Sequence, residues 1–270
     1  EFHHHTLSIE PRPEYTMNAA LEQHTQKVKE YESGLPYLKV LYENKAFYFA
    51  TPNEKCNFFA LSIANREPKT NEWIKSFEPG EIFFDIGANN GIYGLLAAIL
   101  RDCTVYAFEP HFGSYYVMCL NIFANKLENR MFAYPLAITD KEDYGSLYLS
   151  ATWAGKSLNN YGESRPHEDP LWNATIPQAA VSTSIDAFVS RVGVFPNHIK
   201  VDVDGLEHAI VEGASETLSN KALRSIMLEL DLKDQKHIDV IPKMQAFGFN
   251  RYEEDEAGVF FYRDQAEESE

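Results

Sequence analysis

The sequence predicts an α/β protein with a mostly parallel sheet and helices on both of its faces. An apolar run, Ile82 to Ile86, favours a strand buried on both sides, because such strands are hydrophobic without alternation. The turn Gly87-Ala-Asn-Asn-Gly91 follows directly, and its glycines permit positive φ and the close approach of a ligand. Apolar residues then recur at helical spacing: Ile92, Leu95, Leu96, Ile99 and Leu100. Strand, glycine turn and helix in this order indicate a nucleotide-type site at the carboxyl end of a parallel strand.

The length of 270 residues and the 44% of hydrophobic side chains suffice to bury the core of one α/β domain. Residues 1–5 resemble the remnant of an expression tag, so we leave them out of metal and fold arguments. Residues 6–78 are expected to form an N-terminal arm, a hairpin and a short helix. Residues 79–265 are expected to form the main domain, with a substrate loop at 151–180.

The remaining elements follow from periodicity and from turn residues. Helices are predicted at 17–30, 71–77, 92–100, 112–126, 185–191, 206–218 and 236–247. Strands are predicted at 38–42, 46–50, 104–109, 131–139, 145–150, 181–184, 198–204, 225–231, 249–253 and 258–263. Because a tight turn joins the last two strands, we expect the sheet to end in an antiparallel pair.

The spacing of the glycines indicates which nucleotide the turn suits. A dinucleotide fingerprint is Gly-x-Gly-x-x-Gly, whose amides face a pyrophosphate. Here Asn89 stands where the second glycine belongs, and Asp85 lies just before the turn. A carboxylate repels a pyrophosphate but suits a ligand that carries an ammonium and a sulfonium, so the motif favours S-adenosylmethionine over NAD. The alternative is a tight turn that binds nothing.

Acidic residues follow two further strands. Glu109 lies 18 residues beyond Gly91, where nucleotide-binding units place an acid that accepts the ribose hydroxyls. Alternation along residues 198–204 places Lys200, Asp202 and Asp204 on one side of a central strand. Since unpaired buried charge is costly, these three form either an internal ion pair or an active-site cluster.

Residues 151–180 interrupt the α/β rhythm. A loop of this length in a compact domain is typical of a lid or a substrate-binding segment, and its aromatic residues argue against plain disorder. The residues of interest are Trp153, Lys156, Asn159, Asn160, Tyr161, Arg165, His167 and Trp172. We expect this loop to select the substrate.

Composition limits the partners. The formal net charge is −16, which disfavours nucleic acid because phosphate binding depends on Lys and Arg, and no basic cluster with interleaved aromatics is evident along the sequence. No apolar run is long enough to span a membrane and no secretory signal pattern is present, so we expect a cytoplasmic protein. Three cysteines without metal or disulfide spacing agree with that expectation.

Seven segments together resemble the FkbM family of S-adenosylmethionine-dependent methyltransferases. They are Arg66-Glu-Pro-x-Thr70, Asp85-Ile-Gly-Ala-Asn-x-Gly91, Phe108-Glu-Pro110, Ala137-x-x-Asp140, Thr183-Ser-Ile-Asp186, Lys200-Val-Asp-Val-Asp-Gly-x-Glu207 and Leu228-Glu-Leu230. The resemblance implies a class I methyltransferase (Rossmann-like) fold: a seven-stranded, mostly parallel sheet with helices on both faces and an antiparallel last strand. An N-terminal helix and hairpin would extend it. It also implies O-methylation of a small molecule or a sugar.

The same resemblance implies roles for individual residues. Those lining the methionine end of the cofactor would be Asp85, Gly87, Asn89 and Gly91. Glu109 would hold the ribose, Ala137 and Ile138 would flank the adenine, and Glu67 and Thr70 would close over the cofactor. One departure is Asp204, where the family commonly has glutamate.

A hydroxyl acceptor needs alignment with the methyl group and a base. The candidate base is Asp202 or Asp204, with Lys200 or His167 as further candidates. Alternatively, Asp202, Asp204, Glu229 and Asp231 would hold Mg²⁺ with the acceptor oxygens. Two other classes of function stay open: a nicotinamide-dependent oxidoreductase and a cofactor-binding scaffold without catalysis. Methylation of nucleic acid is disfavoured, because the strand predicted at 198–204 ends in Asp204-Gly-Leu-Glu instead of Asn/Asp-Pro-Pro-Tyr, which would grip a flipped base.

Overall fold

The computed structural model describes residues 19–168 and 173–263, so Trp172 and the tag-like residues 1–5 lie outside the described residues. The chain divides into two compact units, residues 1–35 and 36–270. In the first unit, α1 (Ala19–Ser33) forms the predicted N-terminal helix, and its apolar Leu21 and Val28 are exposed. The second unit holds the sheets and the cavity described below.

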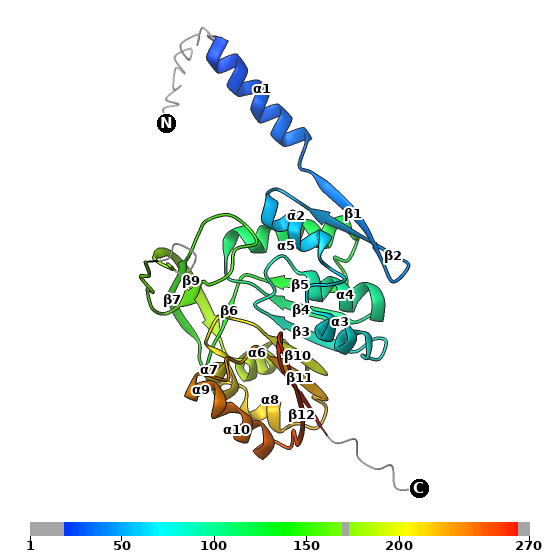
Figure 1. Ribbon diagram of the computed structural model, residues 1–270, viewed down its shortest axis with the longest axis vertical. Coiled ribbons are helices and arrows are strands. Elements are labelled where there is room, and N and C mark those ends of the chain that lie inside the picture. The colour runs from blue at the N-terminus through cyan, green and yellow to red at the C-terminus, as the bar shows by residue number, and fades with distance from the viewer. Residues whose placement is uncertain (1–18, 169–172, 264–270) are drawn as a thin grey trace, which may run out of the picture. The chain divides into compact units, whose positions relative to one another are not determined.

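Seven strands of the described chain form the central sheet, in the order β12-β13-β11-β10-β3-β4-β5 (Figure 1). Their bounds are β3 Ile82–Ile86, β4 Thr104–Phe108, β5 Met131–Tyr134, β10 His198–Val201, β11 Ser225–Leu228, β12 Arg251–Asp255 and β13 Gly258–Tyr262. Neighbouring strands from β5 to β11 are parallel, whereas β13 is antiparallel to both β11 and β12. The predicted seven-stranded class I sheet with an antiparallel last strand is therefore confirmed.

Helices cover both faces of this sheet (Figure 1). Their bounds are α2 Glu54–Leu61, α3 Pro68–Lys75, α4 Ile92–Arg101, α5 Phe112–Ala124, α6 Ile185–Val192, α7 Glu207–Glu212, α8 Ser215–Ser219, α9 Gln235–Ile238 and α10 Val240–Ala246. Successive residues of β3 point to opposite faces, so Phe83 packs with α3 and α4 while Phe84 packs with α6 and α10. None of the described helices combines the length and the apolar composition needed to cross a membrane.

A second sheet stands beside the first, in the order β6-β9-β7-β8. Its strands are β6 Ala137–Ile138, β7 Asp143–Leu149, β8 Asn160–Tyr161 and β9 Ile176–Thr183. The predicted strand 131–139 is therefore two strands in different sheets: β5 ends at Tyr134, and β6 pairs with β9. Part of the predicted loop 151–180 is likewise regular, because β8 and the start of β9 both pair with β7.

Three helical regions differ from those expected. No helix was predicted at α2, whose Asn53 side chain accepts the Cys56 amide as an N-cap. The helix predicted at 206–218 is broken into α7 and α8, and the helix predicted at 236–247 is broken into α9 and α10. Apolar spacing runs through these breaks, so periodicity alone joins the pieces.

The hairpin of β1 (Tyr37–Tyr42) and β2 (Lys45–Ala50) belongs to the main unit. Phe47 and Phe49 of β2 are buried in the same core as α3 and α4. Asn121 of α5 accepts the Ala50 amide at 2.7 Å and fixes the hairpin against this helix. The main unit consequently begins at Pro36, earlier than the predicted boundary at residue 79.

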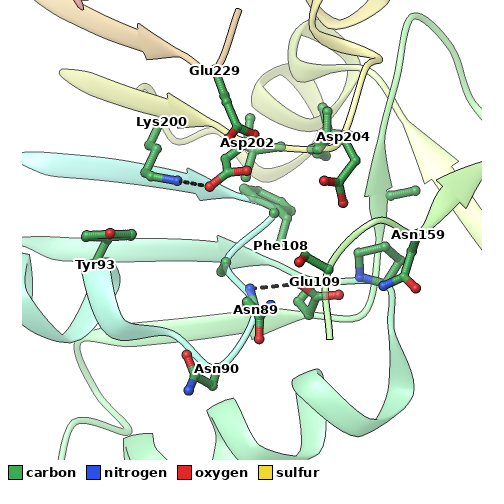
Figure 2. A pocket seen from close by; sticks show the side chains of 18 of the residues that line it. Asn89, Asn90, Tyr93, Phe108, Glu109, Asn159, Lys200, Asp202, Asp204 and Glu229 are labelled. Atoms are coloured by element: carbon green, nitrogen blue, oxygen red, sulfur yellow. Dashed lines mark hydrogen bonds and ion pairs between the residues drawn. The ribbon is translucent and has the colours of Figure 1, made fainter. Parts of the chain in front are cut away.

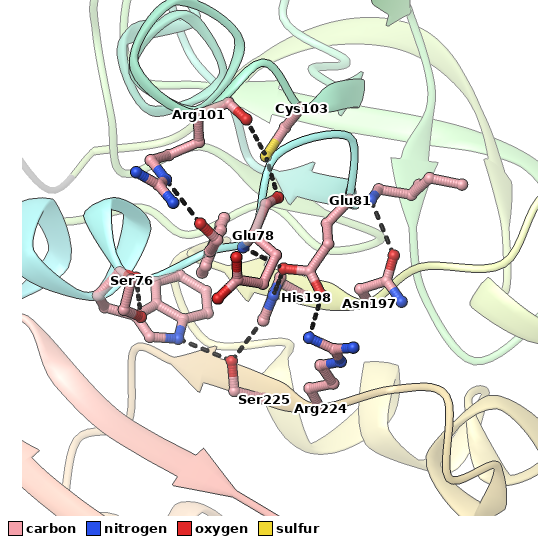
Figure 3. Close-up of polar contacts among 12 residues, drawn as sticks. Ser76, Glu78, Glu81, Arg101, Cys103, Asn197, His198, Arg224 and Ser225 are labelled. Atoms are coloured by element: carbon pink, nitrogen blue, oxygen red, sulfur yellow. Dashed lines mark hydrogen bonds and ion pairs between the residues drawn. The ribbon is translucent and has the colours of Figure 1, made fainter.

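A buried polar network joins the amino-terminal ends of three central strands (Figure 3). The Trp73 indole donates to Ser225 Oγ at 2.8 Å, and Ser225 Oγ lies 2.7 Å from His198 Nδ1. His198 Nε2 lies 2.8 Å from Glu81, which also pairs with Arg224. Burial lowers the pKa of His198, so the neutral ring accepts from the Ser225 hydroxyl and donates to Glu81. The network fixes β3, β10 and β11 relative to each other at the edge opposite the cavity.

Candidate active site

A cavity of about 270 Å³ opens at the carboxyl ends of β3, β4 and β10. Most of the residues predicted to bind the cofactor line it: Glu67, Gly87, Asn89, Glu109, Ala137 and Ile138. All three predicted catalytic residues line it too: Lys200, Asp202 and Asp204. The fold thus brings together segments that are more than 130 residues apart in the sequence.

Three predicted cofactor residues, Thr70, Asp85 and Gly91, are not among the residues that line the cavity. Thr70 is buried and donates to Glu67 Oε2 at 3.0 Å, so it supports a lining residue. Asp85 is fully buried, and its Oδ2 accepts the Gly94 amide at 3.0 Å. Burial raises the pKa of Asp85 to about 6, against the opposing effect of the Lys200 ammonium. Asp85 is therefore placed behind the turn, and other acids give the cavity its negative charge.

The glycines of the turn face the protein. Gly87 has φ +75°, and a Cβ there would lie 1.8 Å from the Asp202 carbonyl oxygen. Gly91 has φ +82°, and its Cβ would lie 2.9 Å from Met118 Cγ. Glycine is needed at Gly87 because the backbone that follows β10 approaches it closely, and at Gly91 because the Met118 side chain of α5 does so.

We expect Gly87→Ala to lower the free energy of unfolding by about 2–5 kcal/mol, from left-handed strain plus displacement of β10. The matched control is Gly80→Ala, since Gly80 has φ +86° but open space around its Cβ position. That variant should show the backbone strain alone, about 1–2 kcal/mol. Urea unfolding measures both variants, and equal losses would contradict the close approach to Asp202.

Glu109, directly after β4, is held by two backbone amides. Asn89 N donates to its Oε2 and His111 N to its Oε1, each at 2.8 Å. Burial raises the pKa of Glu109 to about 7, although both amides oppose the shift. Each carboxylate oxygen has a second acceptor position. Figure 2 shows Glu109 beside Asn89 at the centre of the cavity.

Lys200, Asp202 and Glu229 form a charged cluster in the cavity (Figure 2). Lys200 is 1% exposed, and its Nζ donates to Asp202 Oδ2 at 2.7 Å. Burial acts to lower the pKa of Lys200, but Asp202, Glu67 and Asp85 together raise it above its usual range. Lys200 therefore stays charged. The predicted ion pair is present and lines the cavity, while a catalytic role for Lys200 stays a prediction.

Asp202 and Glu229 share one proton. Burial acts to raise the pKa of Asp202, but the Lys200 ammonium and a hydrogen bond from Glu229 outweigh it and lower the pKa to about 2. Burial and the Asp202 carboxylate raise the pKa of Glu229 to about 10. At neutral pH Asp202 is the carboxylate and Glu229 the hydrogen-bond donor.

Asp204 faces the same cavity from the turn after β10, with φ +60°. Its Oδ2 accepts the Leu158 amide at 2.7 Å, and its carbonyl oxygen accepts Arg165 Nη1 at 3.1 Å. Burial and the Asp202 carboxylate raise the pKa of Asp204 to about 7, although the Leu158 amide opposes the shift. Asp204 thus both fastens the predicted substrate loop and presents a carboxyl group that titrates near neutral pH.

The loop closes one wall of the cavity with Lys156, Ser157, Leu158, Asn159 and Tyr161. Its first part is fastened to α2 and α5: Asn53 donates to the Ala154 carbonyl at 3.0 Å, and Gly155 N donates to Ser114 Oγ at 3.2 Å. His167, the further candidate base, is not among the lining residues.

Sequence reasoning missed Phe59 and Tyr93, which also line the cavity. Tyr93 follows the glycine turn on α4, and the Lys200 Nζ lies 4.8 Å from the centroid of its ring. Its place in an apolar helical pattern marks it as a core residue, so no local signal distinguishes it. Among residues 19–168 and 173–263, no group of three or more His, Cys, Asp or Glu could hold a metal ion. The Mg²⁺ alternative therefore finds no ligand set in the described part of the chain.

Comparison with solved structures finds distant similarity. A methyltransferase FkbM from Methylobacillus flagellatus KT is 14% identical over 69% of this chain and 44% of its own, with a TM-score of 0.44. A SAM-dependent methyltransferase from Agrobacterium tumefaciens is 10% identical over 78% and 57%, with a TM-score of 0.43. An rRNA methylase from Streptococcus thermophilus is 12% identical over 73% and 95%, with a TM-score of 0.41. This chain spans less than two thirds of the first two structures.

Because these TM-scores lie below 0.5, family membership is judged from the sequence alone. No curated protein matches the sequence. The model of the methyltransferase FkbM domain, in contrast, matches residues 85–251, which span β3, the glycine turn, Glu109 and the Lys200 cluster. That match covers more than half of the chain, so the protein belongs to the methyltransferase FkbM domain family.

Proposed function

We propose that the protein transfers the methyl group of S-adenosylmethionine to a hydroxyl of a small molecule or a sugar. The observation that supports this proposal is one cavity that a ribose-type acid, Glu109, lines together with the acids Asp202 and Asp204 at the end of β10. The first feature suits the donor, and the second suits a hydroxyl that must lose a proton.

The lining residues fit the donor. Glu109 offers acceptor positions to ribose hydroxyls, and the buried Oδ1 of Asn89 has no hydrogen-bond partner among the described residues. Ala137 and Ile138 supply an apolar wall beside the turn, suited to an adenine. Glu67 and Asp202 supply negative charge, which suits an ammonium and a sulfonium. When bound, S-adenosylmethionine supplies an electrophilic methyl group.

Asp204 is the better matched general base of the two carboxylates. A base works best when its pKa lies near the operating pH, and the pKa of Asp204 is about 7. Asp202, with a pKa of about 2, is too weak a base but keeps a fixed negative charge beside Lys200. In this mechanism Asp204 accepts the hydroxyl proton, Asp202 orients the acceptor, and the loop on Asp204 excludes water.

Calorimetry tests the choice of cofactor. We expect S-adenosylhomocysteine, the demethylated product, to bind the full chain with a micromolar or tighter dissociation constant. Glu109→Ala should weaken that binding by about tenfold to a hundredfold, because two charge-assisted hydrogen bonds to the ribose are lost. NADH is the control ligand. Tight uptake of NADH with no response to S-adenosylhomocysteine would overturn the proposed function and favour an oxidoreductase.

A further inference from the structure

Three basic side chains lie near one another beside the cavity: Lys55, Arg66 and Lys156, which we name the rim cluster. Arg66 and Lys156 line the cavity. Lys55 stands beside them on the first turn of α2, where burial and the charges of Arg66 and Lys156 lower its pKa. Because like charges repel, grouping these three cations costs electrostatic energy. The group stands out in a chain whose net charge is −16.

The fold holds two members of the rim cluster, Lys55 and Arg66, against one aromatic ring. Phe59 is buried and lines the cavity. The Arg66 Cζ lies 4.2 Å and the Lys55 Nζ 4.8 Å from the centroid of its ring. Lys55 also packs against the loop, since a Cβ on Gly155 would lie 3.1 Å from Lys55 Cγ. The cations are thus positioned by α2, by the segment before α3 and by the substrate loop.

The negative charge near the rim cluster faces Arg66, whose charge helps to lower the pKa of Asp202 and which also pairs with Glu67. The only described acid paired with it is Glu67, whose Oε1 lies 3.5 Å from Arg66 Nε, while its Oε2 accepts the Thr70 hydroxyl. Within the described residues, Lys55 and Lys156 form no ion pair, and the two Nη groups of Arg66 have no hydrogen-bond partner. Two ammonium groups and the fork of a guanidinium are thus available to an oxyanion.

We propose that the rim cluster binds a phosphate or carboxylate group on the methyl acceptor, while the acceptor's hydroxyl reaches Asp204 in the same cavity. This inference rests on the proposed function. The carboxylate of the donor carries one negative charge, which is too little to balance the three cations of the rim cluster. A phosphate carries up to two negative charges and balances them better. One member of the rim cluster, Lys156, also lies on the loop expected to select the acceptor.

Inorganic phosphate is the probe, and the lysine ammonium groups report on it. The full chain is reductively methylated with ¹³C-formaldehyde, which preserves the lysine charges, and phosphate is titrated against chloride at constant ionic strength. Lys55→Gln and Lys156→Gln assign the two signals. We expect both signals to shift saturably in the millimolar range, and Arg66→Gln to weaken the response at least fivefold. Lys221, an exposed lysine far along the chain, should not respond.

A second titration separates the acceptor from the donor. With S-adenosylhomocysteine at saturation, the phosphate response should persist, and Arg66→Gln and Lys156→Gln should change the affinity for S-adenosylhomocysteine less than twofold. Lys221→Gln, with the same change of charge, is the control. The proposal is overturned if no saturable shift occurs, if Lys221 shifts equally, or if S-adenosylhomocysteine displaces phosphate, which would assign the rim cluster to the donor's carboxylate. Failure of S-adenosylhomocysteine to bind at all would instead contradict the proposed function.

Discussion

Asp204→Asn is expected to lower kcat by about 10²–10⁴-fold, the usual contribution of a positioned general base. Asparagine keeps an oxygen that accepts the Leu158 amide, so the loop should stay in place while the base is lost. The affinity for S-adenosylhomocysteine should change less than threefold. The assay uses an acceptor identified by mass spectrometry of molecules that copurify with the protein. A kcat within threefold of wild type would remove Asp204 from the chemistry.

The pH dependence provides an independent check. The pKa of Asp204 is raised to about 7, so the carboxylate forms above this pH and kcat should fall as pH decreases through about 7. Asp204→Asn should abolish this acidic limb. Because the pKa of Glu109 is also about 7, the wild-type profile is measured at saturating donor. The affinity for S-adenosylhomocysteine against pH then reports Glu109 separately.

Lys200→Met is expected to lower the free energy of unfolding by about 3–5 kcal/mol at neutral pH, since it removes the cation from the half-buried Asp202 and the fully buried Asp85. Asp202 loses a hydrogen bond of 2.7 Å, and the fully buried Asp85 loses the cation that favours its charged form. Methionine approximates the length of the lysine stem, so the loss reports charge more than packing. Urea unfolding monitored by circular dichroism gives the value.

The loss of stability in Lys200→Met should become smaller at low pH, and also when Asp202 is replaced. In the wild type the folded pKa of Asp202 is depressed to about 2, so its contribution to stability is present above the unfolded value of 3.8 and is lost as pH falls towards 2. In Lys200→Met the pKa values of Asp202 and Asp85 rise, so the difference between variant and wild type should shrink as pH falls. Lys200→Met with Asp202→Asn should recover at least half of the loss. Equal losses in the single and double variants would mean that Lys200 acts through packing.

Local patterns in the sequence determined most of the fold. The limits of β3 and the start of α4 follow from one apolar run, one glycine turn and one helical period. The helix predicted from residue 185 begins there, and the Ser184 side chain caps it by accepting the Ala187 amide. Alternation placed Lys200, Asp202 and Asp204 on one side of a strand, and it agrees with the hydrogen bond between the first two. It fails for Asp204, because β10 ends at Val201 and Asp204 has φ +60° in the turn that follows. Such features depend on neighbours within a few positions, so a single sequence contains them.

Tertiary structure alone decided how the site is closed. Lys55, Arg66 and Lys156 are separated by up to about a hundred positions, so no run of basic residues marked the rim cluster. The contact of Leu158 with Asp204 and the departure of Ala137–Ile138 into a second sheet are equally non-local. Asp85 shows the same limit, because its motif suggested contact with a ligand whereas packing placed it behind the turn. The physical reason is that charge and burial at a cavity depend on distances between segments, and sequence spacing does not encode those distances.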